Sequence, residues 1–190
     1  LGLFIITNLN TVGKIKQQNT TYRVEENREV VLGVHELIFT NQINSDSLFA
    51  IYQTQDFQDW RIYKHPNYYK VHTYRVYSEA DELMALIVFN SHTNHVAYVC
   101  QSTFHPDLKK AEKVRILQSA TRMLFKSGIV LVRNWVFNSN PVNKEEIKIQ
   151  NQAGYMHIQR GIGLVWKKLD TVDIEPEDFY LSRIATQGVI

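Results

Sequence analysis

The amino-acid sequence predicts a mixed α/β fold in which antiparallel strands are followed by a parallel strand–helix–strand crossover, with helices on both faces of the sheet. Three observations predict it. Strand patterns follow one another closely between residues 70 and 104, and a long amphipathic helix pattern then precedes an apolar strand pattern at 129–137. The 190 residues include 44% hydrophobic residues, 8 Gly and 4 Pro, which suits one folded core and excludes a collagen-like or low-complexity chain.

Two strands are predicted at the start of the chain. Residues 2–10 are apolar and β-branched, and residues 21–25 alternate Tyr22 and Val24 with polar neighbours, which is the period of a half-buried strand. The Asn- and Gln-rich residues 14–20 predict a loop between them. Since the first residue is Leu rather than Met, we interpret residues 1–20 as an N-terminal strand and loop compatible with the remnant of a longer chain.

Two helices are predicted next. Apolar residues recur at spacings of three and four over residues 30–39, which predicts a short helix. A second helix is predicted over residues 54–63, with Thr54 suited to its N-terminus and with Phe57, Trp60 and Tyr63 facing inward. The dipeptide His65-Pro66 ends it, because the residue before a proline is pushed out of helical geometry.

The central strands come in close order. Residues 70–77 alternate, residues 83–89 are nearly all apolar and therefore predict a strand covered on both faces, and residues 96–104 complete a hairpin through the polar turn at 90–94.

The clearest helix follows the polar break at residues 105–110. Its apolar stripe is followed by Lys126 and by Gly128, a cation in the last turn and a glycine stop. Strand 129–137 follows, so strands 96–104 and 129–137 are expected to be parallel neighbours across a right-handed crossover.

The C-terminal part is predicted to contain a short helix at 144–152, closed by Ala153-Gly154, and a last strand at 164–169. The acidic residues 170–178 contain a proline and predict a tail. We therefore expect one domain over residues 21–169 and a C-terminal tail over 170–190.

Composition excludes several classes of protein. A net charge of +2 is too small to indicate a nucleic-acid binder, and no apolar run approaches the ~20 residues that span a bilayer. Cys100 is the single cysteine, which excludes an intrachain disulfide and favours a cytoplasmic location. His92 and His95 share the spacing of a metal pair, but no third ligand is apparent, so we expect no metal.

The element order over residues 22–169 resembles that of the GNAT acyltransferase superfamily. Asp59-Trp60-Arg61, followed by His65-Pro66 and Tyr68-Tyr69, further resembles a stretch in GNAT-like proteins of bacterial surface-polysaccharide clusters. The resemblance implies that acyl-CoA or acetyl-CoA is a co-substrate, bound between two parallel strands that splay apart. It implies that the acyl group, from CoA or an acyl carrier protein, passes to a small-molecule amine or amino sugar.

The resemblance also implies the residues of the donor site. The end of strand 96–104 would contact the donor, and three lysines at the start of the following helix would bind its phosphates. These residues are Gln101, Ser102, Thr103, Phe104, Lys109, Lys110 and Lys113. The family's glycine-rich phosphate loop has no counterpart, since residues 104–113 contain no glycine. The lysines are alternatively part of a solvated loop, with Asp107 or Glu112 offsetting their charge near the helix start.

Two residues are candidates for proton transfer. Tyr155 is a candidate acid, because Gln150 stands where the family has its tyrosine, and His105 is a candidate base. The alternatives are an aromatic plug for Tyr155 and a turn residue for His105.

On the acceptor side, the resemblance implies Trp60, Arg61, His65 and Tyr68, whose planar groups suit sugar faces or carboxylates, together with Asn134. The alternative for Trp60 and Arg61 is a helix that packs on the core through its Trp. The alternative for Asn134 is a core asparagine that is hydrogen-bonded to the backbone. For the whole chain, the alternative to an acyltransferase is a GNAT-fold interaction module without activity, or half of a duplicated GNAT protein.

Overall fold

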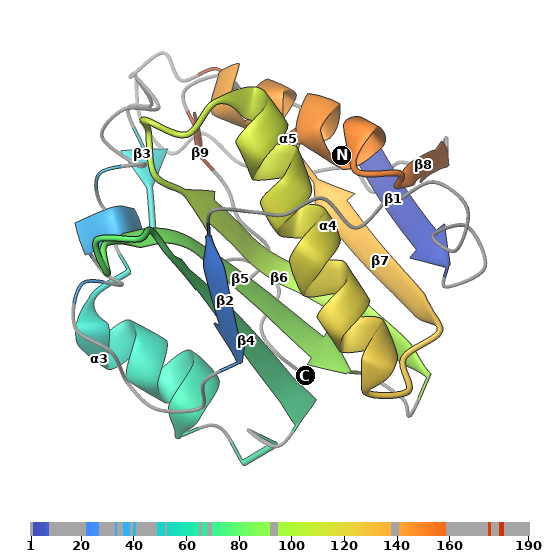
Figure 1. Cartoon of the computed structure of the whole chain (residues 1–190), viewed down its shortest axis with the longest axis horizontal. Coiled ribbons are helices and arrows are strands. Elements are labelled where there is room, and N and C mark those ends of the chain that lie inside the picture. Colours follow the sequence, from blue (N-terminus) through green and yellow to red (C-terminus); the bar gives the residue numbers. More distant parts are fainter. Residues whose placement is uncertain are drawn as a thin grey trace.

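The computed structural model describes a seven-stranded mixed sheet with helices on both faces (Figure 1). The described residues are 2–7, 22–26, 33, 36–38, 40, 49–51, 53–64, 66–67, 70–91, 95–137, 141–158, 175 and 179–180. The strands are β1 (Gly2–Thr7), β2 (Arg23–Glu26), β3 (Phe49–Ala50), β4 (Val71–Tyr77), β5 (Leu83–Ser91), β6 (Val96–Phe104), β7 (Leu131–Val136), β8 (Met156–Ile158) and β9 (Phe179–Tyr180). The helices are α3 (Gln55–Gln58), the π-helix η1 (Asp59–Tyr63), α4 (Lys110–Lys126) and α5 (Pro141–Gln152).

The strand order in the large sheet is β2-β4-β5-β6-β7-β1-β8, and β3 pairs with β9 in a separate parallel pair. β2, β4, β5 and β6 are successively antiparallel, whereas β6 and β7 are parallel. The predicted antiparallel run and the parallel crossover through α4 are therefore confirmed. The N-terminal strand β1 lies between β7 and β8 and is antiparallel to both, which the order of elements did not predict.

Two apolar clusters pack on opposite faces of the sheet. On one face, alternate residues of β4–β7, such as Ile87 and Val99, pack against α4 and α5, which lie on the near side of the sheet in Figure 1. On the other face, Leu86 and Val88 pack against Ile62 of η1 and against residues 37–38 of a short helical stretch. Because successive residues of a strand point to opposite faces, β5 is buried from Met84 to Asn90, as predicted for a strand covered on both sides.

The helix α4 has the predicted position and end. Its inward side chains include Leu117, Ala120 and Leu124, which are fully buried, and Gly128 adopts φ +99° just beyond the helix. That left-handed conformation costs glycine little, because it has no Cβ. Thus the apolar period and the glycine stop identified this helix correctly.

The second predicted helix is present; of the residues predicted to face inward, Tyr63 packs against the core, whereas the prediction for Trp60 was wrong. Thr54 is the N-cap of α3, and its hydroxyl accepts a hydrogen bond from the amide of Phe57. The helix then widens into η1, where the Lys64 amide bonds the carbonyl five residues back. Gln58 and Ile62, four residues apart, are buried, whereas Trp60 is 59% exposed. The spacing of three therefore did not identify the residues that face the sheet most directly.

Other differences lie at the C-terminal end. The helix α5 begins at Pro141, three residues before the predicted start, and β8 was not predicted. The strand predicted at 164–169 lies outside the described residues. In the described part of the chain, no helix combines the length and the apolar character needed to cross a membrane.

Candidate functional site

The parallel strands β6 and β7 share a ladder only at their beginning. Val96–Tyr98 pair with Leu131–Arg133, and the register ends there. β6 continues to Phe104 paired with β5 on its other side, and β7 continues to Val136 paired with β1. The two strands therefore part after three residue pairs, at the point where the resemblance implied that they splay.

A glutamate from α5 bridges the parted strands. The Ser102 hydroxyl of β6 donates to Glu146 Oε1 at 2.8 Å, and the Asn134 amide of β7 lies 3.5 Å from the same oxygen. Asn143, one turn earlier in α5, also hydrogen-bonds this carboxyl group. We call Ser102, Asn134, Asn143 and Glu146 the strand-junction cluster.

The carboxyl group of this cluster has an unusual environment. Burial raises the pKa of Glu146, and the hydrogen bonds from Ser102, Asn134 and Asn143 act in the opposite direction. The nearest ion pair of α5 joins its neighbour Glu145 to Lys113 of α4, at 3.1 Å. The Glu146 carboxyl is therefore held by neutral donors, and its burial, not these donors, raises its proton affinity.

The buried side of α5 continues this polar character. Asn143, Glu146 and Gln150 follow spacings of three and four, so they lie along one side of the helix. Gln150 is fully buried, and neither its amide nitrogen nor its amide oxygen has a hydrogen-bond partner. Buried amides are normally paired, so this side chain has donor and acceptor capacity for a ligand.

The four residues predicted at the end of β6 divide between the two faces of the sheet. Ser102 and Phe104 pair with residues of β5 that face α4 and α5, whereas Gln101 and Thr103 lie on the opposite face. Gln101 donates to the Thr103 hydroxyl at 2.9 Å, and its own carbonyl oxygen has no partner. Of the four, the structure brings Ser102 to the strand-junction cluster.

The predicted lysines lie at the start of α4. The backbone amide of Lys109 donates to the Glu112 carboxylate at 2.8 Å, and the Tyr22 hydroxyl donates to the same carboxylate. These bonds lower the pKa of Glu112, the bond from Tyr22 most. Glu112 thus offsets charge at the helix start, while Lys109 itself is exposed.

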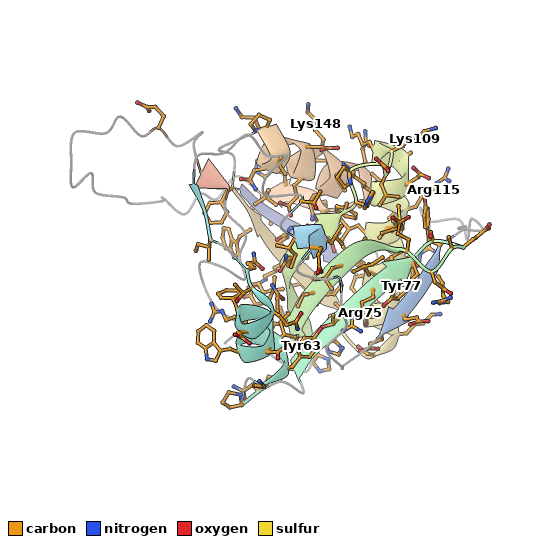
Figure 2. The ribbon with its side chains drawn as sticks, turned by 90° about the vertical axis from the view of Figure 1, so that its left-hand side faces the viewer. Tyr63, Arg75, Tyr77, Lys109, Arg115 and Lys148 are labelled. Atoms are coloured by element: carbon orange, nitrogen blue, oxygen red, sulfur yellow. The ribbon has the colours of Figure 1, made fainter. Side chains whose placement is uncertain are left out.

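The lysine end of α4 is next to a basic part of α5. Lys113 is tied to Glu145 of α5. Figure 2 shows Lys109, Arg115 and Lys148 on the upper side of the molecule, away from Tyr63 and Arg75. Exposed cations from both helices are therefore presented on one side of the fold.

The two candidates for proton transfer lie in different surroundings. Tyr155 is 2% exposed, and its hydroxyl is 2.8 Å from that of Thr121 in α4. Because the Thr121 hydroxyl donates to the Leu117 carbonyl, the Tyr155 hydroxyl donates to Thr121. His105 follows β6, and its Nδ1 accepts from the Asp107 amide at 3.3 Å. No contact described here tests their roles, which stay predictions.

The predicted acceptor residues are only partly described. The Arg61 guanidinium lies 4.9 Å from the centre of the Trp60 ring and 5.9 Å from that of Phe57, so α3 and η1 carry an aromatic and cationic group of which Trp60 is exposed. His65 and Tyr68 lie outside the described residues. Asn134 contributes to the strand-junction cluster instead.

Two groups of residues were missed by the sequence analysis. The first is Glu146, whose spacing from Asn143 and Gln150 was the available signal. The second is the pair Arg75 and Tyr63, joined by a 2.9 Å hydrogen bond under η1, where Arg75 is fully buried. Among the residues described, no group of three or more His, Cys, Asp or Glu could hold a metal ion.

Comparisons with solved structures find N-acetyltransferases. A GCN5-related N-acetyltransferase from Kribbella flavida matches with a TM-score of 0.49 and 12% identity, over 82% of this chain and 53% of that one. A GCN5-related N-acetyltransferase from Sphaerobacter thermophilus matches with a TM-score of 0.48 and 10% identity, over 83% of this chain and 48% of that one. A tandem GNAT protein from the clavulanic acid biosynthesis pathway matches with a TM-score of 0.44 and 8% identity, over 81% of this chain and 49% of that one.

The chain spans about half the length of these three structures. No protein-family model matches the sequence, and no curated protein matches it. The finer resemblance to proteins of surface-polysaccharide clusters stays a prediction.

Proposed function

We propose that this protein transfers an acyl group from a thioester of CoA, or of an acyl carrier protein, to a small-molecule amine. The observation that carries the proposal is the end of the β6–β7 ladder after Tyr98 and Arg133. A strand whose neighbour has parted presents one backbone edge to a ligand, and an extended arm with amide groups is suited to that edge. Such an arm would bring its thioester to the strand-junction cluster.

The phosphates of the donor would be bound by side-chain charge. Residues 104–113 have no glycine, and the Lys109 amide is taken by Glu112, so backbone amides are not the main phosphate ligands in this proposal. Lys109, Lys110 and Lys113 supply cations at the start of α4. Point charges on flexible stems can bind phosphate without close backbone approach.

The acceptor would use the exposed surface on η1. Trp60 and Arg61 present an indole and a guanidinium plane, which suit an amino sugar or an amine that carries a carboxylate. His65 and Tyr68 belong to this acceptor site in the proposal. Asn134 would orient the acceptor at the junction of the strands.

The reaction needs mainly positioning. A deprotonated amine attacks a thioester readily when it is held in line with the carbonyl carbon, and holding two reactants together can supply several kcal/mol of the barrier. The protein would then contribute a rigid sheet, two binding surfaces and a route for one proton.

A second candidate function is a GNAT-fold interaction module without activity. The observation that favours it is that the protein's own carboxylates occupy both places where a ligand would bind. Glu112 takes the amide of Lys109, the N-cap of α4, and Glu146 takes the hydroxyl and amide offered by the parted strands. In this case no thioester would be turned over.

Calorimetric titration with acetyl-CoA and with longer acyl-CoAs tests the proposal. We expect binding to the wild-type chain, and binding weakened about tenfold or more when Lys109, Lys110 and Lys113 are all changed to Gln, a loss of ~1.4 kcal/mol or more. Lys126→Gln, at the far end of α4, is the matched control and should bind as the wild type does. Absence of heat and of any thermal shift with every thioester would exclude the proposal, and binding without turnover would favour the module.

A further inference from the structure

Glu146 is placed where acyl transfer would need a proton to move. We infer that Glu146 carries the proton that passes from the amine nitrogen to the thiolate sulphur. The inference rests on the proposed function and deepens it, since it assigns a catalytic role at the same junction of strands. Three features of the structure support it.

The first feature is position. The Glu146 carboxyl contacts both parted strands, through Ser102 at 2.8 Å and through Asn134 at 3.5 Å. A thioester lying between these strands would therefore have this carboxyl beside it.

The second feature is the neutrality of its partners. Hydroxyl and amide donors hold the carboxyl, so it can gain or lose a proton without breaking an ion pair. Lys113 of α4 is engaged by Glu145, and Arg133 of β7 donates to the Tyr98 hydroxyl on the opposite face of the sheet.

The remaining charged groups near the junction lie on the surface or at the end of β6. Lys144 and Lys148 of α5 are exposed, and His105 at the end of β6 bonds Asp107. Burial raises the pKa of Glu146, which favours uptake of a proton by this carboxyl.

The third feature is the side chain one turn further along α5. Gln150 is buried with both amide atoms unpaired, which points to a ligand on this side of the helix. An amide can bond the thioester or the acceptor but cannot carry a proton. Gln150 would thus orient the reactants, while Glu146 exchanges the proton.

In this reaction Glu146 takes up one proton and then releases one proton. The lone pair of the amine forms the N–C bond at the thioester carbonyl, and the nitrogen proton passes to a Glu146 carboxylate oxygen. The C–S bond then breaks, its electron pair stays on sulphur, and Glu146 returns the proton to the thiolate. Amine and thioester become amide and thiol, and Glu146 ends as it began.

The experiment compares Glu146→Gln with Glu79→Gln, which removes an exposed carboxyl in the turn between β4 and β5. Binding of acetyl-CoA is measured by calorimetry, and thiol release is followed with alkylamines, amino acids and glucosamine. At saturating acetyl-CoA we expect Glu146→Gln to lower turnover at least about 100-fold with acetyl-CoA affinity within about threefold. Glu79→Gln should keep turnover within about twofold, and Glu146→Asp should restore part of the turnover that Glu146→Gln loses.

The outcomes separate the inference from the proposed function. Equal turnover in Glu146→Gln and wild type overturns the inference and leaves acyl transfer standing, as does a rate profile against pH that the substitution leaves unchanged. Carbon-13 titration of the glutamate carboxyls provides a readout without turnover: a Glu146 signal that titrates at the ordinary glutamate pKa also overturns it. Failure of the wild type to bind acetyl-CoA, or to release thiol with every amine, overturns both.

Discussion

The hydrogen bond between Thr121 and Tyr155 offers a direct test of how α4 is attached to the end of α5. The two hydroxyls are 2.8 Å apart, Thr121 is fully buried and Tyr155 is 2% exposed. Burial raises the pKa of Tyr155, so its hydroxyl remains a donor at neutral pH. The perturbation is the set Tyr155→Phe, Thr121→Val and the double variant, each of which keeps most of the side-chain volume.

The expected magnitudes follow from which group loses its partner. Tyr155→Phe removes the donor but leaves the Thr121 hydroxyl bonded to the Leu117 carbonyl, so we expect a loss of ~1 kcal/mol in the free energy of unfolding. Thr121→Val leaves the Tyr155 hydroxyl buried without an acceptor, which costs about 1–3 kcal/mol. In the double variant no hydroxyl is stranded, so we expect it to be more stable than the sum of the single losses by ~1 kcal/mol or more.

Urea unfolding followed by circular dichroism measures all four proteins. For a chain of this length, 1 kcal/mol corresponds to roughly 2–4 °C in Tm, which thermal unfolding resolves. Additive losses, with the double variant as unstable as the two singles together, would refute the assignment of the Tyr155 proton to Thr121. Thiol release by Tyr155→Phe, measured beside its stability, then tests the acid role predicted for this residue.

Other predictions concern single positions and are checked by the same unfolding assays. Ile62→Ala should lower the free energy of unfolding by about 2–5 kcal/mol, because Ile62 is 2% exposed. Trp60→Ala, on the exposed side of η1, should lower it by less than about 0.5 kcal/mol. Similar losses in the two variants would contradict the burial of Ile62 and the exposure of Trp60. Thr54→Ala should cost ~1 kcal/mol because it removes the cap of α3, with Thr54→Ser as a control that keeps the hydroxyl. Gly128→Ala should lower the free energy of unfolding by ~1 kcal/mol because of its φ of +99° alone, since a Cβ at this position would meet nothing within 4 Å. A variant more stable than wild type would contradict this explanation. Because burial raises the pKa of Glu146 above its unfolded value, the native state binds more protons, and stability is full below the unfolded pKa and falls as pH rises through the folded one. Glu146→Gln should remove this loss of stability at higher pH, so the stability of the variant relative to wild type should increase from pH 4 to pH 8. The increase should be ~1.4 kcal/mol for each pH unit between the unfolded and the folded pKa. Parallel curves of stability against pH for the two proteins would contradict the burial of the carboxyl.

Much of the fold was predictable because its signals are local. The helix α4 has an apolar stripe and a glycine stop, and β5 is a nearly continuous apolar run, so each element is determined by residues within it. The cap at Thr54 was predictable for the same reason. The burial of Gln58 and the exposure of Trp60 were not, because the side of this helix that the sheet covers depends on how the helix packs.

The candidate site was predictable only in part. Ser102 and Asn134 lie on the two parallel strands that element order predicts, while their roles stay predictions. Glu146 was missed, since nothing within residues 141–152 shows that this carboxyl reaches a hydroxyl 44 residues away. The polar spacing of Asn143, Glu146 and Gln150 predicts one side of a helix but not what that side contacts.

The sequence by itself determined the central strands, the long helix and the parallel crossover, because periodicity and end signals act over a few residues and the handedness of chains limits the connections. Tertiary structure alone decided where the β6–β7 ladder stops, that β1 lies between β7 and β8, and which carboxyl spans the junction. These depend on how separate elements pack together, and packing brings together groups whose separation in the chain carries no signal of their contact.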